Sequence, residues 1–179
     1  MTTLVGVIAD THVPQRLKYL PPDIARAFDG VALILHAGDI NSQHVLDELE
    51  RIAPVVAVSG NADLWLDLPR SRIVQVESCR IGLTHGHGNW RRYFLDKLRD
   101  RLGPYNLARY LRYASEAFRD VDVVISGHTH QPHLAYGGKV LLFNPGSVAP
   151  EYHTTVGPTV GLLRIQDSVV RAELVRLGC

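Results

Sequence analysis

The sequence has few cysteines and no excess of charge of either sign. Its two cysteines, Cys79 and Cys179, lie far apart in the 179 residues and form no CxxC pair. A disulfide framework is therefore not expected, and this usage fits a reducing cytoplasm, the compartment that we predict. Nineteen basic and 18 acidic residues leave a net charge of +1. This balance provides no overall attraction to nucleic acid or to a membrane surface.

Long hydrophobic runs are also missing. The first residues, MTTLVGVIADTHVPQRL, lack a basic leader, and Asp10 and His12 interrupt their apolar run. Neither a signal peptide nor a membrane span is expected there, so no membrane partner is predicted. The chain shows no internal repeat, low-complexity tract or linker. Since a domain has about 100 to 200 residues, the chain 1–179 is predicted to form one domain.

Short apolar runs alternate with helical patterns along most of the chain. The runs are rich in Val and Ile and bounded by turn formers, which predicts buried strands at 3–9, 31–35, 54–59, 72–77, 80–84 and 121–126. Helical patterns at 21–30 and from Asn41 separate several of them, as in a parallel α/β core. Later segments at 138–148, 160–166 and 169–177 predict an antiparallel hairpin that extends the sheet or forms a second one.

A basic helical region, at about 89–120, interrupts this alternation. From Trp90 to Arg119 it carries eight Lys or Arg and three acidic residues, with a break at Gly103 and Pro104. One interpretation is a positively charged flap over a phosphate site. The other is a solvated helical hairpin whose tyrosines pack on the sheet. The sequence leaves both open.

Groups able to bind a metal follow five of the predicted strands. In an α/β sheet, ligands bind outside the carboxyl ends of the strands. Any one of these groups alone fits a cap or turn, as Asn61 does in VAVSGNAD. Agreement at five strand ends favours a divalent metal site, and carboxylate, amide and imidazole groups suit Mn²⁺, Fe, Zn²⁺ or Ni²⁺. The groups are Asp10 and His12, Asp39, Asn61, His85 and His87, and His128 and His130.

The order of these motifs resembles the calcineurin-like metallophosphoesterase superfamily. DTH, GD, GN, THGH and GHTH are followed by NPGS at 144–147. The chain most resembles the compact bacterial and archaeal phosphodiesterase branch, which shares its fold with a small retromer subunit. The resemblance implies a layered sandwich of two mixed β-sheets flanked by helices. The segment at 89–120 would then be an insertion longer than the smallest members carry.

The same resemblance implies a centre of two divalent metals, with Mn²⁺ expected first and Fe, Zn²⁺ or Ni²⁺ as alternatives. One metal would be held by Asp10, His12, Asp39 and His130; Asp39 would bridge, and Asn61, His85 and His128 would complete the second. Such a centre generates a hydroxide that attacks phosphorus in line. The implied activity is hydrolysis of phosphodiesters.

Ala62 departs from the family pattern. Many members place a histidine after the Asn to protonate the leaving oxygen, a contribution of about 10²- to 10⁴-fold. His87 is our candidate replacement, with a supporting position beside the ligands as its alternative. Substrates with acidic leaving groups would need no replacement. A third interpretation is a protein-binding scaffold with weak or no catalysis, although a scaffold has no need of seven metal-binding groups.

Other residues give weaker indications. Arg91 and Arg92 are candidate contacts to a substrate phosphate, and their alternative is a solvated first helical turn. His36 is expected in the core or beside the ligands, His44 on the surface, and His133 and His153 at the rim of the pocket. Phosphomonoesters and nucleic acid are further substrate alternatives, the latter disfavoured by the neutral charge. A homo-oligomer remains open.

Overall fold

Two five-stranded sheets form the centre of the computed structural model, which describes residues 2–149 and 156–178. The first sheet has the order β10-β9-β1-β2-β3. Its strands are β1 (Thr3–Ile8), β2 (Leu33–His36), β3 (Val55–Ala57), β9 (Thr159–Gln166) and β10 (Val169–Arg176). The first three are parallel, and the β9–β10 hairpin extends the sheet antiparallel to β1, as the sequence predicted for 160–166 and 169–177. The segment at 138–148, which the prediction grouped with this hairpin, instead forms a strand of the other sheet.

The second sheet has the order β4-β5-β6-β8-β7. Its strands are β4 (Ser71–Val76), β5 (Cys79–Thr84), β6 (Val123–Ile125), β7 (His133–Gly137) and β8 (Val140–Asn144). β5, β6 and β8 are parallel, whereas β4 and β7 pair with their neighbours in the antiparallel direction. The sequence predicted a buried strand at 72–77 without its direction; the strand is present, but of the six residues of β4 only Val76 is buried, because β4 lies at the edge of the sheet. Because only two residues separate β4 from β5, the pair closes as a hairpin.

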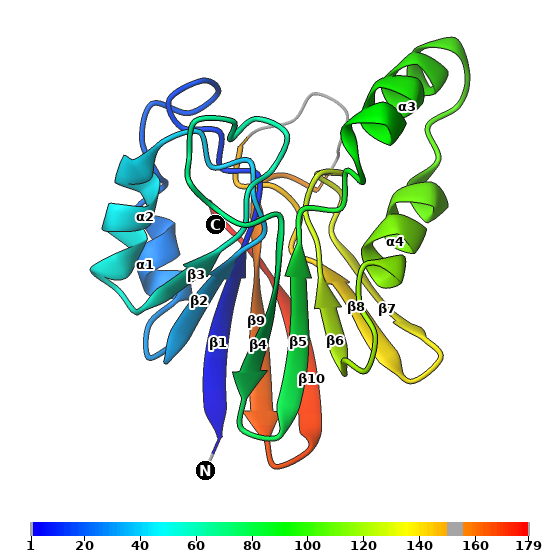
Figure 1. Ribbon diagram of the computed structural model, residues 1–179. Coiled ribbons are helices and arrows are strands. Elements are labelled where there is room, and N and C mark those ends of the chain that lie inside the picture. Colours follow the sequence, from blue (N-terminus) through cyan, green and yellow to red (C-terminus); the bar gives the residue numbers. More distant parts are fainter. Residues whose placement is uncertain (1, 150–155, 179) are drawn as a thin grey trace.

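Helices cover both outer faces of the sandwich (Figure 1). α1 (Asp23–Ala27) and α2 (Gln43–Glu50) pack on the first sheet, and α4 (Leu107–Glu116) packs on the second. β1 is buried on both faces: Val5 and Val7 point between the sheets, whereas Ile8 points to the helices. The fold predicted from the motifs, a layered sandwich of two mixed sheets flanked by helices, is confirmed.

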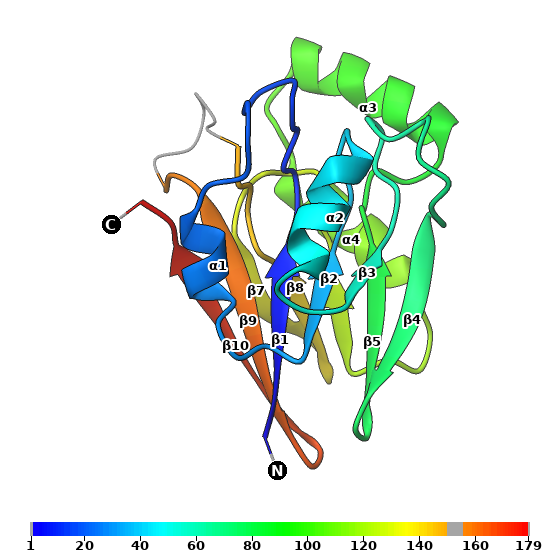
Figure 2. The same ribbon diagram turned by 90° about the vertical axis from the view of Figure 1, so that its left-hand side faces the viewer.

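α3 (Trp90–Leu102) and α4 lie between β5 and β6 in the chain. Both views place α3 beyond the carboxyl ends of the parallel strands, away from the packed layers (Figures 1 and 2). Its outward residues Phe94, Leu95, Leu98 and Leu102 are exposed, while Asp96 is buried. No helix within the described residues combines the length and apolar character needed to cross a bilayer.

Candidate metal centre

The predicted ligands converge where the carboxyl ends of both sheets meet. Asp10 and His12 follow β1, Asp39 follows β2, and Asn61 follows β3 in the first sheet. His85 follows β5, and His128 and His130 follow β6, in the second sheet. The site is therefore formed by loops from two sheets that face each other, rather than by one sheet edge.

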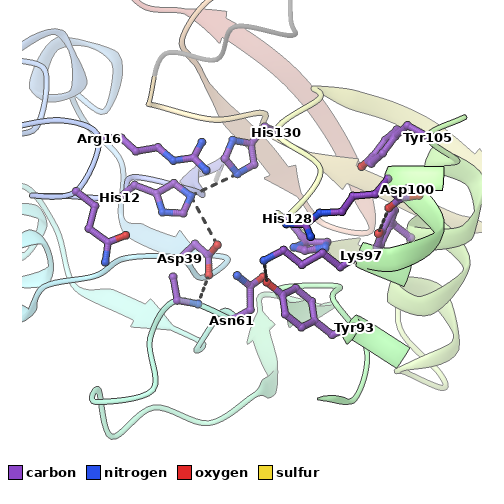
Figure 3. Close-up of a pocket in the computed structure, with 14 residues that line it drawn as sticks. His12, Arg16, Asp39, Asn61, Tyr93, Lys97, Asp100, Tyr105, His128 and His130 are labelled. Atoms are coloured by element: carbon purple, nitrogen blue, oxygen red, sulfur yellow. Dashed lines mark hydrogen bonds and ion pairs between the residues drawn. The ribbon is translucent and has the colours of Figure 1, made fainter. Parts of the chain in front are cut away.

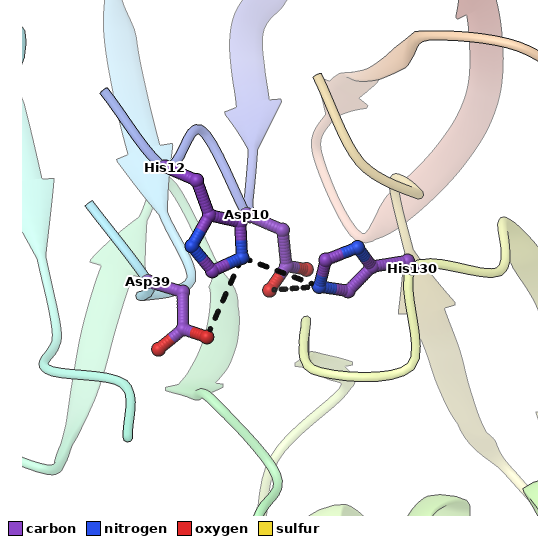
Figure 4. Close-up of side chains that lie close together, drawn as sticks. All are labelled: Asp10, His12, Asp39 and His130. Atoms are coloured by element: carbon purple, nitrogen blue, oxygen red, sulfur yellow. Dashed lines mark hydrogen bonds and ion pairs between the residues drawn. The ribbon is translucent and has the colours of Figure 1, made fainter. Parts of the chain in front are cut away.

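Four of these side chains form a tight cluster (Figure 4). One ligand atom from each of Asp10, His12, Asp39 and His130 lies within 4.8 Å of the others. His130 Nε2 is 3.3 Å from Asp10 Oδ1, and His12 Nε2 is 3.6 Å from Asp39 Oδ2. The cluster is the same set that the family resemblance implies for one metal.

The other carboxylate oxygen of Asp39 faces a second group. Asp39 Oδ1 is 3.4 Å from His85 Nε2, which is 3.2 Å from Asn61 Oδ1. The rings of His85 and His128 lie 5.1 Å apart, centre to centre. Asp39 thus turns one oxygen to each group, as a bridging ligand would.

Hydrogen bonds orient the imidazole rings of His85 and His12 so that their Nε2 atoms point toward the centre. His85 Nδ1 donates to the carbonyl oxygen of Ala37 at 2.8 Å, which leaves the lone pair of a neutral ring on Nε2. His12 Nδ1 pairs with Asn41 Oδ1 at 3.0 Å in the same way. Such hydrogen bonds are the usual means by which proteins orient histidines that bind a metal.

Backbone strain is concentrated at the ligands. Among the described residues, nine non-glycine residues have positive φ, and five are predicted ligands: Asp10, His12, Asp39, His128 and His130, with φ from 49° to 68°. Such conformations cost about 1 to 3 kcal/mol each, and they persist where the surrounding structure enforces them, often at functional sites. These positive φ angles let two residues that are separated by a single residue, such as Asp10 and His12, point their side chains toward the same place.

Close packing explains the glycines of the GD and GN motifs. A Cβ at Gly60 would overlap the Asp39 carboxylate, and one at Gly38, whose φ is +89°, would lie 2.8 Å from the Gly60 nitrogen. The two ligand loops thus approach each other through their glycines.

Asp63 holds these loops together, a role that the sequence analysis missed. Its carboxylate accepts from the backbone N–H groups of Ile40 at 2.8 Å, Asn41 at 2.7 Å and Gly60 at 2.8 Å. Asp63 is 1% exposed. The only signal in the sequence was its position two residues after Asn61, which also fits an ordinary turn cap.

The NPGS turn supports the opposite side of the centre. Asn144 Nδ2 donates to the carbonyl of Gly127 at 2.8 Å and to Thr129 Oγ1 at 3.1 Å. Ser147 Oγ donates to the carbonyl of Asp10 at 3.0 Å. These bonds fix the loop that carries His128 and His130 against the loop that carries Asp10.

The charges and pKa values of the side chains at the centre suit the binding of cations. Burial opposes the ionisation of Asp10 and Asp39, yet His130 beside the former and His85 beside the latter hold both pKa values below their ordinary range. Burial lowers the pKa of His128 to about 3, so this ring is neutral and able to ligate. Burial also opposes protonation of His85, but Asp39 and Asp10 raise its pKa to about 9. Without a metal, the protonated His85 ring supplies positive charge to these carboxylates. A divalent metal bound there would replace that proton and take over the same role.

His87 lies behind the ligands rather than at the open face. The residue is 4% exposed, and its ring contacts the rings of His85, Trp90 and His128. Its Nε2 is 3.2 Å from Arg70 Nη2, and burial lowers its pKa to about 3. The described residues that line the adjoining cavity do not include it. This placement gives no support to a role in proton transfer.

A cavity of about 470 Å³ opens from the centre toward the helical insertion (Figure 3). Its cations are Arg16, Lys97 and Arg101. Arg91 and Arg92 are exposed and are not among the described lining residues; Arg92 lies over the Tyr113 ring. Ala62 does line the cavity, and its N–H donates to Asp39 Oδ1 at 2.8 Å.

The remaining histidines are placed as follows. His36 is fully buried, with Nε2 3.2 Å from Thr11 Oγ1 and Nδ1 accepting from the Gly38 N–H, which agrees with a role beside the ligand loops. His44 is exposed and pairs with Glu48 on α2. His133 begins β7 and is not among the described lining residues, and His153 lies outside the described residues.

Comparisons with known proteins agree with this geometry. The calcineurin-like phosphoesterase superfamily domain matches residues 3–168. A protein named probable metallophosphoesterase from Methanothermobacter thermautotrophicus is 41% identical over 177 residues, covering 98% of this chain and 93% of that protein. Another of that name from Methanocaldococcus jannaschii is 40% identical over 146 residues, covering 82% of this chain and 68% of that protein.

Solved structures show the same fold. Wild-type Vps29 from Entamoeba histolytica, complexed with Zn²⁺, superposes with a TM-score of 0.71 and 27% identity, covering 97% of this chain and 98% of that chain. The family match spans nearly the whole sequence and the ligand loops adopt the arrangement that its motifs require. The chain therefore belongs to the calcineurin-like phosphoesterase superfamily.

Proposed function

We propose that this protein is a metal-dependent phosphodiesterase whose active site holds two divalent metals. Mn²⁺ is the metal that we expect first. The position of Asp39 carries the proposal: its two oxygens face His12 on one side and His85 on the other. The mixture of carboxylate, amide and imidazole donors suits Mn²⁺ and related ions. When bound, two such cations lower the pKa of a water molecule and neutralise phosphoryl oxygens.

The residues of the chain would hold the metals and orient the donor atoms. Asp10, Asp39 and Asn61 supply oxygen donors, while the bonds of His12 and His85 to Asn41 and Ala37 hold their Nε2 atoms in place. The cavity opens onto the centre between these loops and the helices α3 and α4, so a phosphoryl group would enter from the cavity side.

A diester is favoured over a monoester by the size of the cavity. Its volume of about 470 Å³ lies within the usual range for small-molecule sites and extends past the ligands to α3 and α4. The second ester group of a diester would occupy this space, which a simple phosphate monoester would leave unfilled. The comparison to make is kcat/KM across monoesters, linear and cyclic diesters and pyrophosphates.

The decisive test is Asp39→Asn in the protein loaded with Mn²⁺. We expect hydrolysis of bis(p-nitrophenyl) phosphate to fall at least about 100-fold, because a bridging carboxylate is lost. Asp47→Asn is the matched control, since Asp47 is an exposed carboxylate on α2 that bonds only to Gln43 among the described residues. Equal activity of the two variants would contradict the role given to Asp39, and no activity of the wild type with any diester would favour the scaffold alternative.

A further inference from the structure

The helical insertion presents a cationic face to the cavity. Tyr93, Lys97 and Arg101 line the cavity at intervals of four residues along α3, so they lie on one side of the helix. Figure 3 shows Lys97 extending from α3 into the cavity. Lys97 Nζ donates to Tyr93 Oη at 3.2 Å. Two positive charges thus lie about one helical turn apart on this wall.

These two cations are not neutralised by the acidic residues of the same helix. Arg109 of α4 pairs with both Asp96 and Asp100, and Tyr110 Oη donates to Asp100 Oδ2 at 2.5 Å. Within the described part of the chain, neither Lys97 nor Arg101 forms an ion pair. An anionic group of a ligand could therefore bind both.

An open aromatic surface lies on the same side of the cavity. The Tyr105 ring stacks on the Tyr110 ring, with centres 5.6 Å apart and an angle of 22° between the planes. Tyr110 in turn packs on the ligand His128, with centres 4.9 Å apart. Tyr105 remains 45% exposed and lines the cavity, so it can stack with a planar ring.

We propose that α3 and the loop after it form a subsite for a second phosphate and a nucleobase. The substrate class would then be a short nucleotidyl phosphodiester with a terminal phosphate. The metal centre would take the scissile phosphate, Lys97 and Arg101 the terminal one, and Tyr105 a base. This inference rests on the proposed function, and the cavity volume suits a ligand of that size.

The test compares a dinucleotide with and without a 5′-phosphate in the protein loaded with Mn²⁺. We expect kcat/KM to be about tenfold or more higher for the phosphorylated form, as charged hydrogen bonds allow. Lys97→Gln with Arg101→Gln should abolish this preference, so that kcat/KM becomes equal for the two dinucleotides. The loss on bis(p-nitrophenyl) phosphate should be much smaller than the loss on the phosphorylated dinucleotide, because that substrate has no second phosphate.

The matched control is Arg112→Gln with Arg119→Gln. Both arginines are exposed cations of the insertion and neither lines the cavity, so the control removes the same charge and should keep the preference. Tyr105→Leu should raise KM for the phosphorylated dinucleotide about tenfold through lost stacking. Tyr136→Leu, which alters an exposed tyrosine of β7, should not.

Three results would overturn the subsite: no preference for the 5′-phosphate in the wild type, loss of the preference in the control, or equal loss on all diesters in the Lys97 and Arg101 variant. A binding measurement separates this failure from failure of the proposed function. Adenosine 3′,5′-bisphosphate should bind about tenfold more tightly than adenosine 5′-monophosphate, and only the Lys97 and Arg101 variant should lose this gain. If that holds without any hydrolysis, the subsite stands and the proposed activity falls.

Discussion

Asp63 is not a predicted ligand, but it holds in place the loops that carry predicted ligands. Its carboxylate receives three backbone N–H groups from the loops that carry Asp39 and Asn61. Removing it leaves buried donors without a partner, which is among the more damaging changes in a protein interior.

We predict that Asp63→Ala lowers the free energy of unfolding by about 2 to 4 kcal/mol and weakens Mn²⁺ binding about 10- to 100-fold. Urea denaturation and metal titration measure the two effects. Asp67→Ala is the control, because Asp67 is exposed in the same loop. A variant as stable as the wild type, with unchanged Mn²⁺ affinity, would contradict the role assigned to Asp63.

Under the proposed function, Ala62 would limit the leaving groups that the centre can expel. Its side chain lines the cavity beside Asn61, and its backbone N–H supports Asp39. Ala62→His leaves that backbone bond in place and adds a group able to protonate a leaving oxygen.

We predict that Ala62→His raises the rate for alkyl diesters at least about tenfold and leaves the rate for p-nitrophenyl diesters nearly unchanged, since only poor leaving groups need a proton. The measurement is the dependence of log kcat/KM on the pKa of the leaving alcohol, which should become flatter. A parallel shift for all leaving groups would indicate a change in binding instead.

At the scale of elements, α3 and α4 are joined by buried charge. Arg109 of α4 is 13% exposed and pairs with Asp96 and Asp100 of α3, and Tyr113 Oη donates to Asp96 Oδ2 at 3.0 Å. The apolar residues of α3 face outward, so this polar network replaces the usual apolar contact between two helices.

We predict that Arg109→Gln opens the insertion without unfolding the sandwich, because it leaves Asp96 buried with less compensation, at a local cost of about 3 kcal/mol. Hydrogen exchange should accelerate within residues 90–116 and stay unchanged in β1 and β6. Arg112→Gln is the control: its pair with Glu116 is exposed on both sides, so we expect less than about 1 kcal/mol. Faster exchange throughout both sheets would show that the network stabilises the whole fold.

For the whole molecule, the candidate metal centre lies between the two sheets. The predicted ligands follow β1, β2 and β3 of one sheet and β5 and β6 of the other, so a cation bound there would contact both halves of the sandwich. Anything that binds only the folded state stabilises it by mass action.

We predict that Mn²⁺ at 100 times its Kd adds about 2.7 kcal/mol to the free energy of unfolding, and that EDTA removes this gain. For a chain of this size, the melting temperature would rise by about 5 to 10 °C. Calorimetry should show this rise in melting temperature for Asp47→Asn and no such rise for Asp39→Asn. An equal shift in both variants would mean that Mn²⁺ acts at another site.

The superfamily could be predicted from the sequence because strand ends are local features. A run of Val and Ile that stops at Gly and a polar residue determines both a buried strand and the group at its carboxyl end, as at Asn61 and Asp39. The ligand cluster around Asp10, His12, Asp39 and His130 lies where this pattern predicted. The pattern could not predict which loops face each other, because the loops come from two sheets rather than from one.

The tertiary structure alone decided the surroundings of the centre. Position in the chain suggested Arg91 and Arg92 as phosphate contacts, but Lys97 and Arg101 line the cavity. The direction in which α3 faces follows from its ion pairs with Arg109 of the next helix, because its own apolar residues point to solvent. The sequence by itself determined the strands, the polar groups at their ends and hence the family. Packing between separate elements decided which cations, aromatic rings and supporting carboxylates surround the candidate metal centre, because no local spacing encodes such contacts.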